Sequence, residues 1–129
     1  ARYITNGTYL TIMKELLGET VSEAMKPLQT RIAHMVALYE EALTEVNGCE
    51  GQDEKDFLAR RLYDMTAEII MSLLIIADAL KAPELFADSA NVYVRMAEEH
   101  VIGKAAYIQA FRAEDLAAFE AEKVAEEAE

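Results

Sequence analysis

One apolar stripe constrains the fold of the first third of the chain. From residue 10 to residue 46, apolar side chains recur every three or four positions, which is the repeat of one face of an α-helix. The members are Leu10, Met13, Leu17, Val21, Ala24, Leu28, Ile32, Met35, Tyr39, Ala42 and Val46. Asn6 and Gly7 predict a polar helix start, and Asn47 and Gly48 predict a left-handed stop. This stretch therefore predicts helical structure that is buried along one side.

Pro27 interrupts the stripe. A proline inside a helix removes a backbone donor and costs about 3 kcal/mol, so a kink or a break is required. Because the stripe keeps its phase and no Gly or Asn is present to reverse the chain, a kink is the favoured interpretation. The alternative is that Pro27 is the first residue of a separate helix. A helix from Thr8 to Val46 would be roughly 58 Å long, and part of its stripe would need cover from a partner.

The remainder of the chain also predicts helices. A second helix is expected from roughly Glu54 to Leu80, after a loop at residues 47–53, and a third begins between Pro83 and Ala90. Gly103 lies in the third helix, where close packing is expected to compensate for its low helix propensity. The tail from Glu114 to Glu129 has only Leu116, Phe119 and Val124 as large anchors and is expected to fray or to dock weakly.

The second and third helices also have core sides of their own. On the second these are Phe57, Leu58, Leu62, Met65, Ile69, Leu73, Ile76 and Leu80, and on the third Phe86, Ala90, Tyr93, Ala97, Val101, Ala105, Ile108 and Phe111. With only 5 Gly and 2 Pro, the whole sequence predicts an all-α fold. We expect residues 1–129 to form one domain, an antiparallel bundle of three to four long helices with a short C-terminal helix.

Charge excludes several classes of partner. The formal net charge is -12, which disfavours nucleic acid and anionic membrane surfaces. The most apolar run, Ile69 to Leu80, is shorter than the roughly 20 residues needed to span a bilayer. The single cysteine, Cys49, has no internal disulfide partner. These features predict a protein of a reducing compartment, the cytoplasm.

The histidines and carboxylates do not form a recognisable site. A di-iron bundle needs Glu-x-x-His pairs, whereas His34 and His100 follow Arg31 and Ala97 at that spacing, so both histidines are interpreted as structural or surface groups. The acidic row Glu15, Glu19 and Glu23 is interpreted as a solvated face. Asp78 lies inside the apolar run and is expected to be buried and paired, with Lys81 or Arg95 as candidate partners.

Two adjacent arginines are the remaining candidates. Arg60 and Arg61 could bind an anionic ligand such as a CoA phosphate, but neighbouring helix positions diverge by about 100°, so both are not expected to face one phosphate. Gly48 and Gly51 lack the Lys-Ser/Thr of a phosphate-binding loop. We therefore predict no catalytic, cofactor-binding or metal-binding residue in this chain, and no reactive role for Cys49.

Two short stretches of the sequence resemble segments of a known family. Arg2-Tyr3-Ile4-Thr5-Asn6-Gly7 precedes the first helix, and Val101-Ile102-Gly103 lies in the third. They resemble the Asn-Gly entry and the Val-Val-Gly-Gly run of the C-terminal helical domain of bacterial acyl-CoA dehydrogenases. Ala1 and Lys104 depart from the glycines of that pattern.

This resemblance implies a fragment from the C-terminal end of a longer FAD-dependent enzyme. The flavin-binding domains and the catalytic glutamate, which in the family belongs to a Tyr-Glu-Gly-Thr-like segment, would lie upstream of Ala1. The domain would serve structure and homo-oligomerisation in an oxidoreductase acting on the CH-CH group of an acyl-CoA. The competing hypothesis is an independent helical interaction module that binds partners through an exposed face of Met13, Met25 and Met35.

Overall fold

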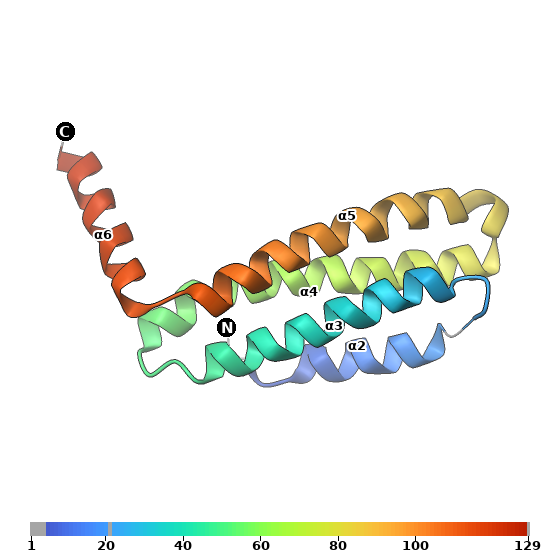
Figure 1. Ribbon diagram of the computed structural model, residues 1–129, viewed down its shortest axis with the longest axis horizontal. Coiled ribbons are helices and arrows are strands. Elements are labelled where there is room, and N and C mark those ends of the chain that lie inside the picture. Colours follow the sequence, from blue (N-terminus) through green and yellow to red (C-terminus); the bar gives the residue numbers. More distant parts are fainter. Residues whose placement is uncertain (1–4, 21, 129) are drawn as a thin grey trace.

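The protein is an up-down-up-down helical bundle with one further helix that projects from it (Figure 1). The computed structural model describes residues 5–20 and 22–128, without the side chains of residues 113, 114 and 116. The helices are α2 (Thr8–Glu19), α3 (Lys26–Asn47), α4 (Gln52–Lys81), α5 (Pro83–Ala110) and α6 (Ala113–Ala128). No strand occurs in this part of the chain. The predicted all-α bundle is confirmed; Arg2, Val21 and the Leu116 side chain lie outside the described part.

The start of α2 follows the predicted polar pattern. Gly7 has φ +84°, a left-handed conformation that favours glycine. Asn6 Oδ1 accepts hydrogen bonds from the backbone nitrogen and the hydroxyl of Thr8, at 3.0 and 2.6 Å. The left-handed stop predicted at Gly48 is wrong, because Gly48 has φ -80° and its N–H donates back to the carbonyls of Thr44 and Glu45. A right-handed final turn thus satisfies the end of α3.

At Pro27 the chain breaks and reverses, so the favoured kink is wrong and the alternative of two helices is right. Pro27 lies in the first turn of α3, where its missing N–H costs nothing. The Gln29 side chain closes the reversal: its Nε2 donates to the Thr20 carbonyl, and its Oε1 accepts from the Ser22 backbone nitrogen at 3.2 Å. No Gly or Asn is needed for this turn, and the 58 Å helix does not exist.

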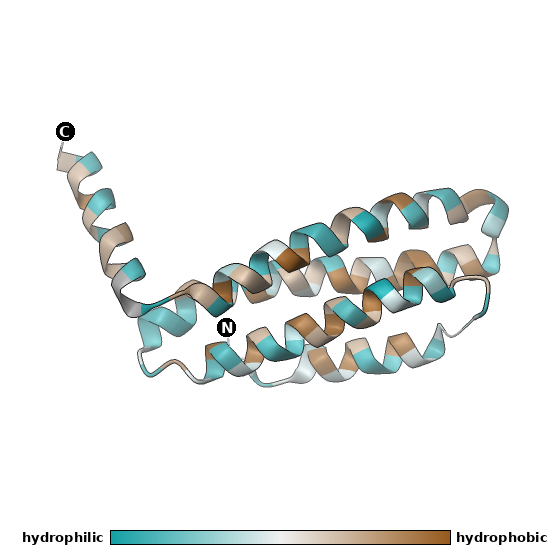
Figure 2. Ribbon diagram, viewed as in Figure 1, coloured by the Kyte–Doolittle hydropathy of each residue, from teal (hydrophilic) through white to brown (hydrophobic). Residues whose placement is uncertain are grey.

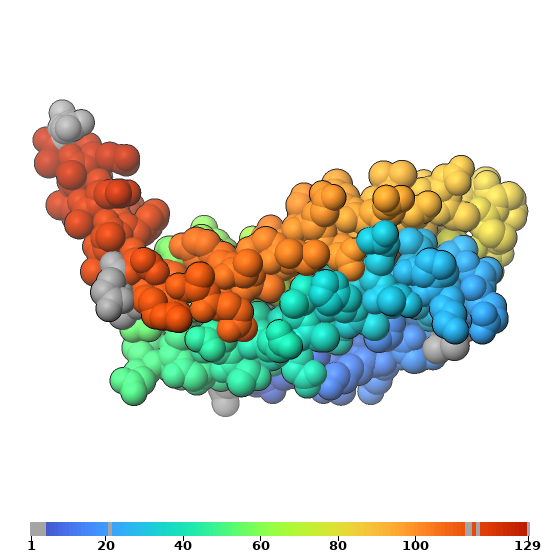
Figure 3. Space-filling view, in the orientation of Figure 1, coloured from blue at the N-terminus to red at the C-terminus, as the bar shows by residue number. Residues whose placement is uncertain are grey.

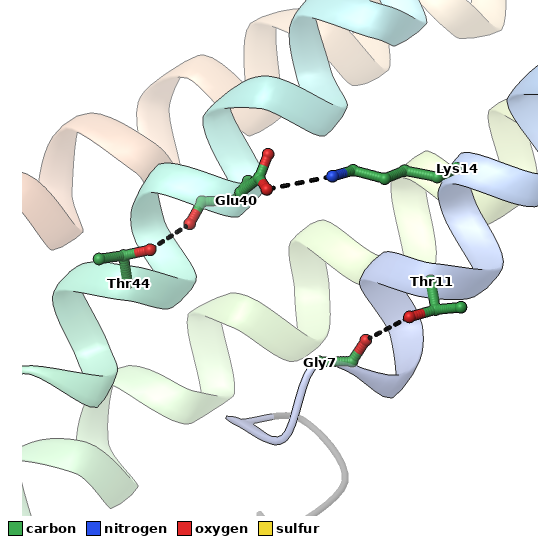
Figure 4. A network of polar contacts seen from close by, with 5 residues as sticks. All are labelled: Gly7, Thr11, Lys14, Glu40 and Thr44. Atoms are coloured by element: carbon green, nitrogen blue, oxygen red, sulfur yellow. Dashed lines mark hydrogen bonds and ion pairs between the residues drawn. The ribbon is translucent and has the colours of Figure 1, made fainter.

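Helix α2 packs antiparallel against α3. Lys14 Nζ lies 3.1 Å from Glu40 Oε1, which links the two helices across their exposed side (Figure 4). Within each helix, the hydroxyls of Thr11 and Thr44 donate to the carbonyls of Gly7 and Glu40. The ion pair is exposed at both ends and contributes little, so burial of apolar surface holds the hairpin together.

The core runs the length of the bundle between α3, α4 and α5, and Met13 extends it to α2. Figure 2 shows hydrophobic residues interspersed with hydrophilic ones along these helices, as one-sided burial requires. Helix α4 contacts α2, α3 and α5, the central position that its apolar C-terminal half predicted. The largest fully buried side chains are Met13, Ile32, Met35, Tyr39, Val46, Leu58, Leu62, Met65, Ile69, Leu73, Ile76 and Ile108.

Three other expectations about packing are wrong. Met13, Met25 and Met35 are 0, 8 and 0% exposed, so the methionine face of the interaction-module hypothesis is core. Gly103 is exposed, and a Cβ there would meet no atom within 4 Å, so no close packing compensates for it. Phe86 is exposed rather than buried, because it lies in the first turn of α5, at the α4–α5 connection.

Helix α6 leaves the bundle at the end where α5 stops, and Figure 3 shows it standing away from the other helices. Phe119 reaches back to Phe57, with ring centroids 5.6 Å apart. Val124 is largely exposed. The weak docking predicted for the tail is confirmed. Nowhere in the described ranges is there a helix long and apolar enough to cross a bilayer.

Candidate functional site

On the side of α5 that faces α3, an arginine and a histidine meet one carboxylate. Arg31 Nη1 donates to Glu98 Oε1 at 2.6 Å, and His34 Nδ1 lies 3.1 Å from Glu98 Oε2. Burial raises the pKa of the largely buried Glu98 carboxyl, but the hydrogen bonds from His34 and Arg31 and their charges outweigh it, so the pKa lies below its ordinary value. This cluster ties α3 to α5 and is structural.

A second histidine joins α5 to α4. His100 Nδ1 lies 2.8 Å from Glu68 Oε1. The other oxygen, Glu68 Oε2, is buried and has no hydrogen-bond partner among the described residues. Burial, and after it the charge of Glu68, raise the pKa of Tyr93. Both histidines therefore lie in pairs between helices, which fits the structural role that the sequence predicted for them.

Beyond this pair, aromatic rings hold an arginine between α4 and α5. The Arg61 guanidinium carbon lies 3.9 Å from the ring centroid of Tyr107 and 4.8 Å from that of Phe57, within the range of cation–π attraction. Phe57 in turn stacks on Phe111, with centroids 5.3 Å apart. Because α4 supplies Phe57 and Arg61 one turn apart and α5 supplies the other two rings, the antiparallel register of these helices fixes the position of Arg61.

Arg61 and Tyr107 also line one part of the α4–α5 surface, a solvent-open groove. Its lining consists of Arg60, Arg61, Asp64, Glu99, His100, Gly103, Lys104 and Tyr107. Within the described part of the chain, no carboxylate lies within ion-pair distance of Arg60, Arg61 or Lys104. Gly103 contributes no side chain, so the groove stays clear beside His100. We call this the cationic half of the groove.

A second, separately lined hollow on the α4–α5 surface lies nearer the α4–α5 connection and has mainly apolar walls. Ile75, Asp88, Ser89, Val92, Tyr93 and Met96 line this part, which we call the apolar half. Met96 and His100 are one helical turn apart on α5, so the two hollows lie on consecutive turns of that helix. On α4 their nearest lining residues, Asp64 and Ile75, are three turns apart.

Cys49 has a poor environment for nucleophilic chemistry. Burial raises the pKa of its thiol, and the nearby charges of Glu54 and Glu45 raise it further, whereas a reactive cysteine requires the thiolate. Its Sγ lies 3.6 Å from the Glu45 carbonyl oxygen. Among the described residues, no three His, Cys, Asp or Glu side chains come together in a geometry that could hold a metal ion.

The other candidates from the sequence have mixed outcomes. Asp78 is exposed rather than buried, because it points away from the neighbouring helices, and neither Lys81 nor Arg95 forms an ion pair with it in the described structure. The row Glu15, Glu19 and Glu23 is exposed, as predicted.

Arg60 and Arg61 line the same groove, because their long side chains bridge the angular separation of neighbouring helix positions. Sequence reasoning missed Lys104 and Tyr107 as their companions. The contacts within each helix could be recognised from the sequence, because residues four apart share one face of a helix. Phe57 and Arg61 are four residues apart, and so are His100 and Lys104. The missing part is the pairing of α4 with α5, which no local pattern specifies.

Comparison with known proteins identifies the fold. The family described as "Acyl-CoA dehydrogenase C terminal" matches residues 5–116, which include the helices α2 to α5. The chain belongs to the acyl-CoA dehydrogenase C-terminal family. This acyl-CoA dehydrogenase C-terminal domain has the predicted identity, and its four-helix bundle is the part that the family shares.

A solved structure supports the same assignment. The acyl-CoA dehydrogenase family protein from Porphyromonas gingivalis is 31% identical, with a TM-score of 0.78. The alignment covers 86% of the present chain and 96% of that chain, so the crystallised chain is similar in length to this domain. Comparison with curated protein sequences gives no match.

Proposed function

We propose that this acyl-CoA dehydrogenase C-terminal domain is a structural and oligomerisation part of an FAD-dependent enzyme that oxidises the Cα–Cβ bond of an acyl-CoA. The observation that carries the proposal is the family match over residues 5–116. The catalytic base and the flavin belong to other domains of the same polypeptide in this proposal. No residue of the bundle is assigned a catalytic role.

The grooves of the bundle do not fit a flavin. The groove along α4 and α5 is open to solvent, and its walls carry Asp64 and Glu99 beside the cations, whereas a flavin ring system requires an enclosed, largely apolar cavity. When bound elsewhere in the enzyme, FAD would supply the two-electron acceptor. In this proposal the bundle contributes packing surface to the enzyme.

The outward face of α4 supports a packing role. Tyr63, Met71 and Leu74 are 59, 50 and 48% exposed and lie at helical spacing on one face. Exposed apolar side chains that cluster in this way mark interaction surfaces. In the sequence, the reason to expect oligomerisation was an uninterrupted first helix too long to be covered by the rest of the chain. That helix does not exist, so the exposed face of α4 is now the reason to propose oligomerisation.

The enzyme assignment is tested on the full-length gene product. We expect it to purify with bound flavin, and we expect acyl-CoA added without oxygen to bleach the flavin absorbance at some chain length. The 129-residue domain alone should be colourless. A flavin that stays oxidised across the whole chain-length series would contradict the dehydrogenase activity.

Oligomerisation has a separate test. Sedimentation of the 129-residue domain over a wide concentration range should show self-association, and Leu74→Lys should weaken it by placing a charge on the outward face of α4. Glu41→Lys on the exposed side of α3 is the matched control. A strict monomer at every concentration, together with a full-length protein that is also monomeric, would end this half of the proposal.

A further inference from the structure

We infer that the two hollows on the α4–α5 surface together bind one anionic amphiphile, with a phosphate or carboxylate head group in the cationic half and an alkyl tail that reaches the apolar half. This goes beyond the structural role proposed above and does not depend on it. The juxtaposition that carries it is an unpaired cation cluster, Arg60, Arg61 and Lys104, next to exposed apolar walls.

Three cations on the α4–α5 surface have no ion-pair partner in the described structure. The chain has 24 acidic residues and only 12 basic ones, so a carboxylate is available to most cations, and Lys14 and Arg31 each have one. Arg60, Arg61 and Lys104 have none in the described structure, although Asp64 and Glu99 line the same groove. Their N–H groups are therefore free to donate to an external anion, while Asp53, Asp56 and Glu120 line a neighbouring hollow together with Arg60 and Arg61.

The Arg61 side chain is held in place before any ligand binds. Tyr107 and Phe57 hold the Arg61 guanidinium against their rings, so little side-chain freedom is lost when Arg61 binds a ligand. A stacked guanidinium keeps its N–H groups directed outward in the plane of the fork. Lys104 is half-buried on the opposite wall. An oxyanion between the two walls would meet donors from both helices.

The apolar half offers exposed side chains to the alkyl tail of the ligand. Val92 and Met96 are 71 and 44% exposed, which is unfavourable for apolar side chains unless something covers them. Met96 lies two helical turns, roughly 12 Å, from Lys104 along α5, a span that a medium-length alkyl chain covers. Between them, Gly103 leaves the groove open, since a Cβ there would meet no atom within 4 Å. Each methylene that leaves water should strengthen binding up to about fourfold.

The test uses octyl phosphate as the probe, with inorganic phosphate and octyltrimethylammonium as comparisons. Calorimetry measures the binding affinity, and amide chemical shifts of the labelled protein locate the bound ligand. We expect octyl phosphate to bind at least tenfold more tightly than phosphate, with shifts at Lys104, Gly103 and Met96. Octanoate distinguishes a carboxylate from a phosphate head group, and groove-localised binding of either supports the inference. Equal affinity for phosphate and octyl phosphate, or for the cationic and anionic amphiphiles, would overturn it.

Matched variants locate the head group. Arg60→Glu combined with Lys104→Glu should weaken octyl phosphate binding at least tenfold. Lys81→Glu combined with Arg95→Glu makes the same charge change on the same two helices but outside the groove lining, and should leave the affinity within about twofold. Equal losses in both pairs would show a general charge effect and overturn the inference.

One substitution locates the tail. Met96→Gln should weaken octyl phosphate binding and leave phosphate binding unchanged, because it alters only the apolar half. All substituted side chains are exposed or half-exposed, and circular dichroism verifies their folding. If a charge variant does not fold, the shift map of the unsubstituted protein still decides the outcome, since shifts confined to α2 and α3 would contradict the groove.

Discussion

The two long sides of α5 meet the charged side chains of their neighbours in different arrangements, although His100 also pairs with Glu68 on the α4 side. Toward α3, Arg31 and His34 both contact the carboxylate of Glu98, so charges are matched within the protein. In the groove toward α4, Arg61 and Lys104 have no carboxylate partner in the described structure, and apolar side chains remain exposed. Satisfied interactions maintain the fold, whereas unsatisfied ones are available to other molecules. The comparison therefore separates surfaces that stabilise the bundle from surfaces that can bind.

The strongest way to sharpen this contrast is to alter one helix at a buried and at an outward position. Ile69 of α4 is fully buried in the shared core, so Ile69→Ala should lower the free energy of unfolding by about 2–5 kcal/mol through lost burial and a residual cavity. Met71→Ala, two residues further on, removes a half-exposed side chain and should cost less than about 1 kcal/mol. Urea unfolding of both variants measures the difference, and equal losses would break the comparison.

The matched charges of the α3 side give the next largest effect. Glu98→Gln removes the carboxylate shared by Arg31 and His34, and we expect a loss of about 1–2 kcal/mol in the free energy of unfolding. The expected loss is small because the side chains of Arg31 and His34 both remain accessible to water. Glu99→Gln, on the next residue but in the groove toward α4, should change stability by less than about 0.5 kcal/mol. A larger effect at Glu99 would mean that the groove, and not the cluster of Arg31, His34 and Glu98, stabilises α5.

The same carboxylate predicts a pH dependence of stability. The folded-state pKa of Glu98 lies below the ordinary value of 4.5, so its contribution is present above that value and is lost as the pH falls through the lower, folded-state pKa. The original protein should therefore lose more stability than Glu98→Gln on acidification below about pH 4.5. Urea unfolding at a series of pH values measures the gap, which should narrow toward low pH; a constant gap would contradict the shift.

The smallest predicted effect has the opposite sign. Gly103→Ala adds a Cβ that meets no atom within 4 Å, and alanine favours a helix interior by about 1 kcal/mol. We expect a gain of about 0.5–1 kcal/mol by thermal or urea unfolding. Gly7→Ala is the contrasting control, because its φ of +84° is strained for alanine, and it should lose stability. A loss at Gly103 would show packing in the groove that the structure does not contain.

The buried pattern of the long helices was predictable because core positions repeat with the helix. The second helix was expected over residues 54–80 and runs from Gln52 to Lys81. The third was expected to begin between Pro83 and Ala90 and begins at Pro83. The ends of these helices depend on local residues that the sequence displays. The reversal before Pro27 does not, because Gln29 reaches back to Thr20 and Ser22 without disturbing the phase of the stripe.

The groove was less predictable for a related reason. A pair such as Phe57 and Arg61 is local to one helix, but the partner ring of Tyr107 comes from another helix. Which turn of α4 faces which turn of α5 depends on the packing of the whole core. Asp78 shows the same limit, since an apolar neighbourhood in the sequence did not reveal which way its side chain points.

The chain enters and leaves the bundle at the same end. Asn47 Nδ2 donates to the Thr5 carbonyl at 2.9 Å, and Phe111 stacks on Phe57 near the start of α4, so both connections lie beside the α3–α4 loop. The α4–α5 connection is at the far end of a rod whose longest helices are roughly 45 Å long. If the proposed flavin-binding domains join the chain at this end, the bundle acts as a lever: a rotation of about 10° at the junction moves the far tip by roughly 8 Å, from the helix length above. A label at Leu85 would therefore report small reorientations of this domain with the greatest amplification.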